Sequence, residues 1–227
     1  MRKLLAIAAA ILLTGVSLVA SGQTPANGTR IFHSAEVISA SRVGIPINSV
    51  ANGIVEVHLT IGEAGNIEQV IVARSLASVT EEAVRSVKTW KFAPATMRGK
   101  PVESQLTVFV VFCPLAILTP DLPLTPIAGD AIPVAGILPA VSPEVTEAKY
   151  PPDGNARVVG GTVVLRVLVG ADGQPGLVRV VKDAPTMTES ARIAVSGWKF
   201  SPAQVNGKAA ISGVVVAFAF RNPIVAY

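Results

Sequence analysis

The sequence predicts an α+β protein made of two small β-β-α-β domains, each with one helix packed on an antiparallel sheet. Three observations predict this fold class. One long segment recurs further along the chain, each copy opens with alternating side chains typical of a strand with one buried face, and each copy carries one apolar stripe at helical spacing. Half of the 227 residues are hydrophobic and 15% are charged, so apolar material for cores is ample.

The clearest sign of the repeat is a hexapeptide. Residues 90–95, Trp-Lys-Phe-Ala-Pro-Ala, recur as residues 198–203, Trp-Lys-Phe-Ser-Pro-Ala, at an offset of 108 positions (198 minus 90). The same offset aligns residues 35–112 with the second copy without a gap. A gapless match of this length indicates an internal duplication.

Each copy starts with two predicted strands. Apolar side chains alternate with polar ones from Val55 to Ile61, and we expect the polar set, Glu56, His58 and Thr60, to face solvent. The segment from 163 to 169 repeats the pattern with a more apolar outer face. Gly65 and the Asp172-Gly173 pair supply the turns, because glycine readily takes the positive φ of a tight hairpin. The returning strands are expected at about 67–74 and 177–182.

A helix and a final strand complete each copy. Residues 78–81 and 186–189 match a capping box, which predicts a helix start in which Glu81 and Glu189 have a capping role. The helical stripes should lie on the sheet, so the tryptophan that ends each stripe is expected in the core. Their members are Val79, Ala83, Val87 and Trp90 in the first copy, and Met187, Ala191, Val195 and Trp198 in the second. Final strands are expected at about 104–112 and 212–220.

The N-terminus predicts export. Arg2 and Lys3 precede an apolar run over residues 4–20, and small residues follow, so residues 1–22 form a predicted signal peptide cleaved after Gly22. The destination is then the periplasm or beyond. The alternative is an inner-membrane anchor formed by residues 4–20, which is short for a bilayer span. Residues 23–34 are expected to be a flexible lead-in, 35–113 and 143–227 the two domains, and the proline-rich segment 114–142 a linker.

Composition and side-chain chemistry argue against several classes of function. Lysine and arginine are not clustered, so nucleic-acid binding is not expected. Cys113 is the only cysteine, which excludes an internal disulfide; it is expected to be a buried apolar residue, with an intermolecular disulfide as the alternative. The two histidines, His33 and His58, lack further metal ligands nearby in the sequence. We therefore expect no enzyme activity, cofactor, metal or small-molecule substrate.

Each copy resembles the C-terminal domain of the TonB family. The resemblance is carried by Gly53-Ile54-Val55, by the Trp-Lys-Phe-x-Pro-Ala element and by Gly99-Lys100, with Gly161-Thr162-Val163 and Gly207-Lys208 in the second copy. It covers about two thirds of the chain. The family fold is β-β-α-β, and the best-known member pulls on outer-membrane transporters by pairing its last strand with a short receptor segment. This chain departs from that member in its doubled domain, in its short linker and in an N-terminal segment without the motor-coupling histidine, so energy transduction is not expected.

Two hypotheses follow from these observations. In the first, a cell-envelope protein partner, for example an outer-membrane protein, adds a strand to the edge strand that ends each copy. The candidate partner-binding residues are Leu106, Val108, Val110, Phe112, Val214, Val216, Phe218 and Phe220. In the second, the protein is structural, and these strands pair with each other or in a homodimer, because an open apolar edge is an aggregation hazard.

Overall fold

The computed structural model describes residues 31–46, 49, 52–113, 136–144, 148 and 160–221, all within a unit that begins at Ile31. The predicted signal peptide and the predicted segments 23–30 and 114–135 lie outside the described residues. Four further short strands lie before or at the start of the copies: β1 (Phe32–His33) and β2 (Glu36–Ser39) for the first, and β9 (Ile137–Leu138) and β10 (Val141–Glu144) for the second. The structure therefore corrects two expectations, because β1 lies in the predicted lead-in and β9 in the predicted linker.

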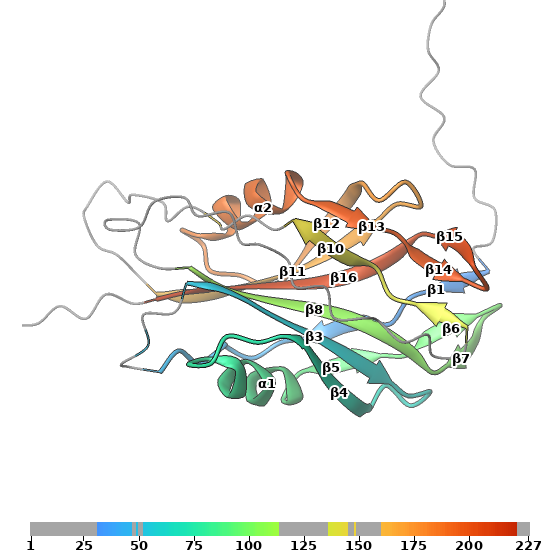
Figure 1. Ribbon diagram of the computed structural model, residues 1–227, viewed down its shortest axis with the longest axis horizontal. Coiled ribbons are helices and arrows are strands. Elements are labelled where there is room, and N and C mark those ends of the chain that lie inside the picture. Colours follow the sequence, from blue (N-terminus) through green and yellow to red (C-terminus); the bar gives the residue numbers. More distant parts are fainter. Residues whose placement is uncertain are drawn as a thin grey trace, which may run out of the picture. The chain divides into compact units, whose positions relative to one another are not determined.

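The elements of the first copy recur at the predicted offset (Figure 1). The first copy comprises β3 (Gly53–Ile61), β4 (Ile67–Arg74), α1 (Thr80–Lys88), β5 (Lys91–Ala93), β6 (Ala95–Met97), β7 (Lys100–Val102) and β8 (Ser104–Cys113). The second comprises β11 (Gly161–Val169), β12 (Pro175–Lys182), α2 (Thr188–Ser196), β13 (Lys199–Ser201), β14 (Ala203–Val205), β15 (Lys208–Ala210) and β16 (Ser212–Phe220). The α+β class is confirmed, and the short strands β5 to β7 and β13 to β15 extend the simple β-β-α-β order.

The long strands of both copies form one six-stranded sheet in the order β12-β11-β16-β8-β3-β4. Neighbours within each copy are antiparallel, whereas β8 and β16 pair in parallel at the junction of the copies. The expectation of two domains with separate sheets is thus corrected. The two copies share a sheet because the last strand of each supplies the backbone partner of the other.

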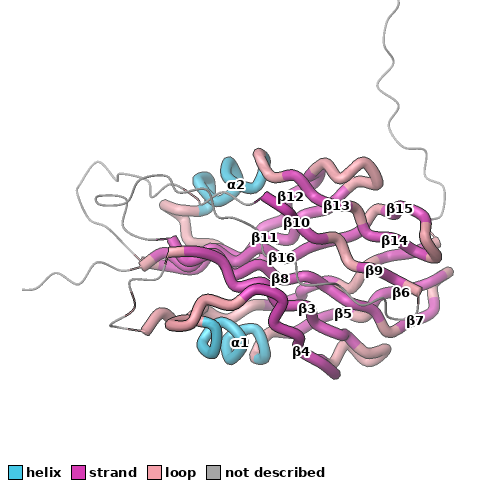
Figure 2. The backbone as a smooth tube through the Cα atoms, viewed as in Figure 1, coloured by secondary structure: helices cyan, strands magenta, loops and turns pink. Residues whose placement is uncertain are grey.

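One helix lies on each face of this sheet (Figure 2), and each face carries its own hydrophobic core. On the first face, the side chains of Val55, Val57 and Leu59 pack beneath α1. On the second face, those of Val163 and Leu165 pack beneath α2. Each core also contains residues of the other copy, so neither copy completes its core alone. The predicted helical stripes are buried as expected, including both tryptophans.

The short strands form small sheets separate from the six-stranded one. In the first copy β1 pairs with β6 and β2 with β5, and in the second β9 pairs with β14 and β10 with β13. The segment around β2 also reaches the other copy. Ser34 Oγ accepts a 2.8 Å hydrogen bond from the Gly213 amide, and Thr162 Oγ1 accepts one of 3.1 Å from the Val43 amide.

The predicted turns are present. Gly65 and Gly173 have φ of 81° and 79°, and a Cβ on Gly65 would lie 2.5 Å from the backbone oxygen of Phe92. Arg98-Gly99 links β6 to β7 with both residues at positive φ, the geometry of a two-residue hairpin loop. Asn206-Gly207 does the same between β14 and β15.

The helix starts differ from the expected capping box. The N-cap positions are Val79 and Met187, and neither helix has a side-chain cap hydrogen bond. Instead, Thr80 Oγ1 accepts a 2.7 Å hydrogen bond from the Leu76 amide, and Thr188 Oγ1 accepts one of 3.1 Å from the Ala184 amide. The threonine hydroxyl therefore holds the preceding loop, and the capping role expected for Glu81 and Glu189 is not observed.

Candidate functional site

The predicted partner-binding strands lie in the middle of the shared sheet. β8 pairs with β3 on one side and β16 on the other, and β16 pairs with β11 and β8. All eight predicted side chains are at most 1% exposed: Leu106, Val108, Val110, Phe112, Val214, Val216, Phe218 and Phe220. The first four belong to the core on the first face and the last four to the core on the second. The expectation that these strands form open edges is therefore corrected.

The outer edges of the sheet belong to other strands. β4 ends the sheet on one side and β12 on the other, and no described strand pairs with the outer side of either. An edge strand presents unpaired backbone N–H and C=O groups that can template another strand. These two strands are the open backbone edges of the six-stranded sheet within the described residues.

A groove runs beside the first half of β4. It has a volume of about 780 Å³ and is lined by residues 64–70 of the hairpin, by Ile38 of β2 and by Lys88, Trp90, Lys91 and Phe92. Ile38 is 63% exposed. The groove therefore places apolar side chains and two lysines next to an open strand edge.

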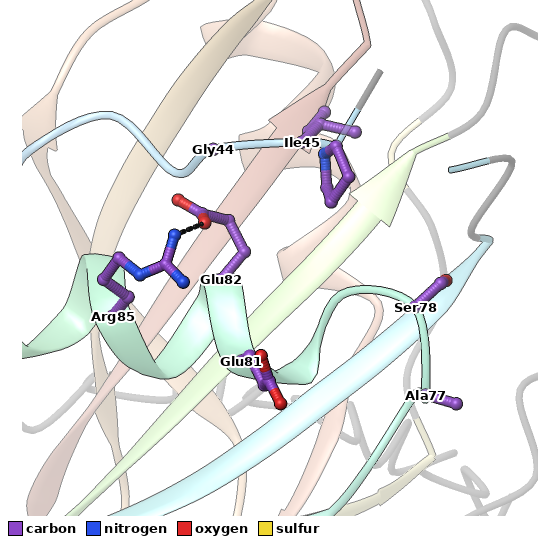
Figure 3. Close-up of a pocket in the computed structure, with 8 residues that line it drawn as sticks. Gly44, Ile45, Ala77, Ser78, Glu81, Glu82 and Arg85 are labelled. Carbon is purple, nitrogen blue, oxygen red and sulfur yellow. Dashed lines mark hydrogen bonds and ion pairs between the residues drawn. The ribbon is translucent and has the colours of Figure 1, made fainter. Parts of the chain in front are cut away.

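A second hollow, of about 500 Å³, lies at the start of α1 (Figure 3). Glu82 and Arg85 point toward each other below Gly44 and form a 2.6 Å ion pair, whereas Glu81 points away from them. The Ser78 hydroxyl, also at this hollow, lies 3.2 Å from the Ser49 hydroxyl. The arrangement shows an exposed ion pair of the kind that contributes little to stability, and it does not bring a nucleophile next to a base.

The polar side chains of β3 are buried, which corrects the expectation that they face solvent. Glu56, His58 and Thr60 lie on the second face of the sheet, and His58 is 1% exposed. His58 Nε2 lies 3.0 Å from Glu56 Oε1, and Arg74 Nη2 lies 3.9 Å from Glu56 Oε2. Because both copies share the sheet, the second face of β3 adjoins the core that lies beneath α2. Polar alternation therefore did not indicate exposure here.

The counterpart of His58 in the second copy has a different partner. Arg166 lies on β11, on the first face, and its Nη2 atom is 2.5 Å from Glu36 Oε1 of β2. This ion pair joins the segment that precedes the first copy to the sheet of the second. It adds to the contacts of Ser34 and Val43 across the same junction.

The remaining predicted residues lie apart from one another. His33 is exposed on β1 opposite Thr96. Cys113 is buried at the end of β8, as expected from the sequence. Among the described residues there is no group of three or more His, Cys, Asp or Glu side chains that could hold a metal ion. Within the same part of the chain, no helix is long and apolar enough to span a bilayer.

Comparison with known families gives one match. The family model described as Gram-negative bacterial TonB protein C-terminal matches residues 49–114 and 146–221, together more than half of the chain. The two matched segments agree with the two copies. Neither the curated proteins nor the solved structures that were compared gave a significant match.

Proposed function

Because the chain belongs to the family of Gram-negative bacterial TonB C-terminal domains, we propose that it is an exported protein that recruits a protein partner in the cell envelope by strand addition. The family consists of non-enzymatic interaction modules of the envelope. A doubled module of this kind is therefore an envelope protein-interaction unit. The predicted signal peptide supports export to the periplasm.

The open edges β4 and β12 carry the proposal, and what leaves them as the free edges of the described sheet is the parallel pairing of β8 with β16. This pairing joins Val108 to Val215 and continues to Cys113 and Phe220. Each module thus occupies, with its own last strand, the edge that a receptor segment would otherwise use on the other module. In this proposal the eight predicted residues bind the two modules together.

The partner segment then adds to an outer edge, β4 or β12. Exposed apolar side chains accompany both edges, Val72 on β4 and Leu177 on β12, at 41% and 72% exposure. Backbone hydrogen bonds would supply affinity, and side-chain sites beside the strand would supply selectivity. A partner could add to β8 only after β16 had left it, at the cost of every backbone bond in that pair.

In-cell photo-crosslinking tests this proposal. A crosslinker replaces Val72, Leu177 or, as the buried control, Val108. We expect an envelope protein, such as an outer-membrane protein, to be captured from an outer-edge position and nothing from position 108. Hydrogen exchange should show protected amides throughout β8 and β16.

Two results would count against the proposal. Capture of a partner from position 108, with fast exchange in β8, would mean that the central pair opens for a receptor segment. Absence of any other protein at both outer edges would favour the second candidate, a structural protein whose strands serve only to join the modules. The β8–β16 pair is the observation that favours this second candidate.

A further inference from the structure

The two outer edges of the sheet differ at their centres. In β4 the central residues are Val70, Ile71 and Val72, whereas the same positions of β12 are Val178, Arg179 and Val180. A charged side chain on an edge strand is a common device against pairing with another chain. The second copy has that device in Arg179, which is exposed, and the first copy has an isoleucine in its place.

Packing adds to the difference. β2 lies against β12, and Val181 of β12 packs on the core of the first face. β4 instead borders the open groove that Ile38 and Val70 help to line. Arg179 therefore disfavours pairing of β12 with a second copy of itself, and β2 contacts β12 without pairing along its edge, whereas the edge of β4 is apolar at its centre and borders open space.

We propose that β4 pairs antiparallel with β4 of a second copy of this chain, about a twofold axis at Ile71. The triplet Val70-Ile71-Val72 is symmetric about its centre, so Val70 lies opposite Val72 of the second copy and Ile71 lies opposite itself. β-Branched pairs directly across an antiparallel ladder stabilise it. The same pairing in β12 would set Arg179 against Arg179, which is unfavourable because like charges would lie opposite each other.

The groove beside β4 fits this arrangement. Val70 lines the groove and carries its side chain on the first face, where it opposes Leu59 of β3. Val72 of the second copy would lie next to Val70 on that face, at the mouth of the groove near the exposed Ile38. Two six-stranded sheets would become one continuous sheet, with the edges of β12 at its two ends.

This inference is independent of which envelope protein is bound. The dimer would use the β4 edges and leave the β12 edge of each copy open. Crosslinking from position 72 would then capture a second copy, and a different partner would be captured from position 177.

Disulfide trapping of the purified protein tests the register. Paired residues of an antiparallel ladder have Cα atoms about 4.5–5.5 Å apart, within the range that a disulfide spans. The Ile71→Cys variant should therefore form a covalent dimer rapidly under mild oxidation. The matched Arg179→Cys variant places its cysteine at the equivalent position of β12 and should remain monomeric in the same conditions. Cys113 is buried and should not contribute.

Sedimentation equilibrium of the chain tests the association itself. The unmodified protein should approach twice the monomer mass as its concentration rises. Val72→Lys alters two contacts per dimer, at positions 70 and 72 of each copy, and should raise the dimer dissociation constant about tenfold or more. Leu177→Lys, a matched change at an exposed apolar residue of β12, should leave that constant unchanged.

Clear outcomes would overturn the proposal. A chain that sediments as a monomer at every concentration, with rapidly exchanging amides along β4, would exclude it. So would a dimer that Val72→Lys leaves intact, or one that Arg179→Cys traps as readily as Ile71→Cys. Circular dichroism of each variant verifies that it is folded, and Val72 is exposed enough that its replacement should not prevent folding.

Discussion

Val108 of β8 pairs with Val215 of β16, one residue before Val216, its counterpart in the second copy. Val108 and Val215 both belong to the core on the first face, whereas Val216 belongs to the core on the second. Parallel neighbours that present opposite faces are related by a rotation about an axis along the strands. Because side chains alternate along a strand, such a rotation requires the paired residue and the repeat counterpart to differ by an odd number of positions, which here is one. This offset is what places α1 and α2 on opposite faces.

The shared sheet predicts that the two copies unfold together. Each core contains residues of both copies, so opening one copy would expose the core of the other. We expect a single urea transition, with far-ultraviolet circular dichroism and tryptophan fluorescence coinciding. Trp90 reports on the first copy and Trp198 on the second. Two separated transitions, or a stable monomeric fragment of residues 143–227, would contradict this.

The ring contact between the copies should be a strong source of stability. Phe109 of β8 packs edge-on against Trp198 of the second copy, with ring centroids 5.7 Å apart and an interplanar angle of 87°. Its counterpart in the second copy is Ala217. Phe109→Ala is expected to lower the free energy of unfolding by about 3–5 kcal/mol, measured by urea denaturation.

A double-mutant cycle isolates the ring pair. Phe109→Leu and Trp198→Leu, made singly and together, should reveal a coupling energy of about 0.5–1.5 kcal/mol. If the two single effects simply add, the rings contribute only through the area that they bury, and the geometric contact is not specifically stabilising.

The buried carboxylate of Glu56 should stabilise the fold by compensating the charge of Arg74. Arg74 is 8% exposed, and its side-chain nitrogens have no hydrogen-bond partner among the described residues, so the carboxylate 3.9 Å away is its compensating charge. Glu56→Ala should cost about 3–5 kcal/mol, because it leaves a buried cation unpaired. The double variant Glu56→Val with Arg74→Met should recover most of that loss.

The exposed ion pair on α1 provides the control for this prediction. Arg85 is 70% exposed in its pair with Glu82. Removing it with Arg85→Ala should change the free energy of unfolding by about 0–1 kcal/mol. Equal effects of Glu56→Ala and Arg85→Ala in denaturation experiments would show that the Glu56 site is more hydrated than its burial indicates.

The start of α1 gives a prediction that separates loop anchoring by the Thr80 hydroxyl from helix capping by the Glu81 carboxylate. Thr80 Oγ1 bonds to both the amide and the carbonyl of Leu76, at 2.7 and 2.9 Å. Thr80→Ala should therefore cost about 1–3 kcal/mol, because each of the two hydrogen bonds contributes about 0.5–1.5 kcal/mol. Glu81→Ala should cost less, since this carboxylate acts only through its position in the first turn. If Glu81→Ala lowered the stability in thermal unfolding more than Thr80→Ala does, the result would support the capping box instead.

Local chemistry predicted the elements well. Hydrophobic alternation located β3 and β11, and Gly65 and Gly173 marked turns that the backbone adopts. These features depend on neighbouring residues alone. The capping box was wrong because the helix starts one residue later than the motif requires: Val79 is the N-cap, and the Ser78 hydroxyl lies 3.2 Å from that of Ser49.

The amino-acid sequence by itself determined that this chain is a duplication, that each copy runs strand, strand, helix, strand, and that Trp90 and Trp198 are buried. Only the tertiary structure decided that β8 and β16 lie at the centre of one sheet. It also decided that Glu56 and His58 are buried and that, among the described residues, β4 and β12 are the open edges of the sheet. The physical reason is that alternation assigns a side chain to one face of a strand. Which strand lies beside another, and what covers each face, is decided by pairing between residues about a hundred positions apart.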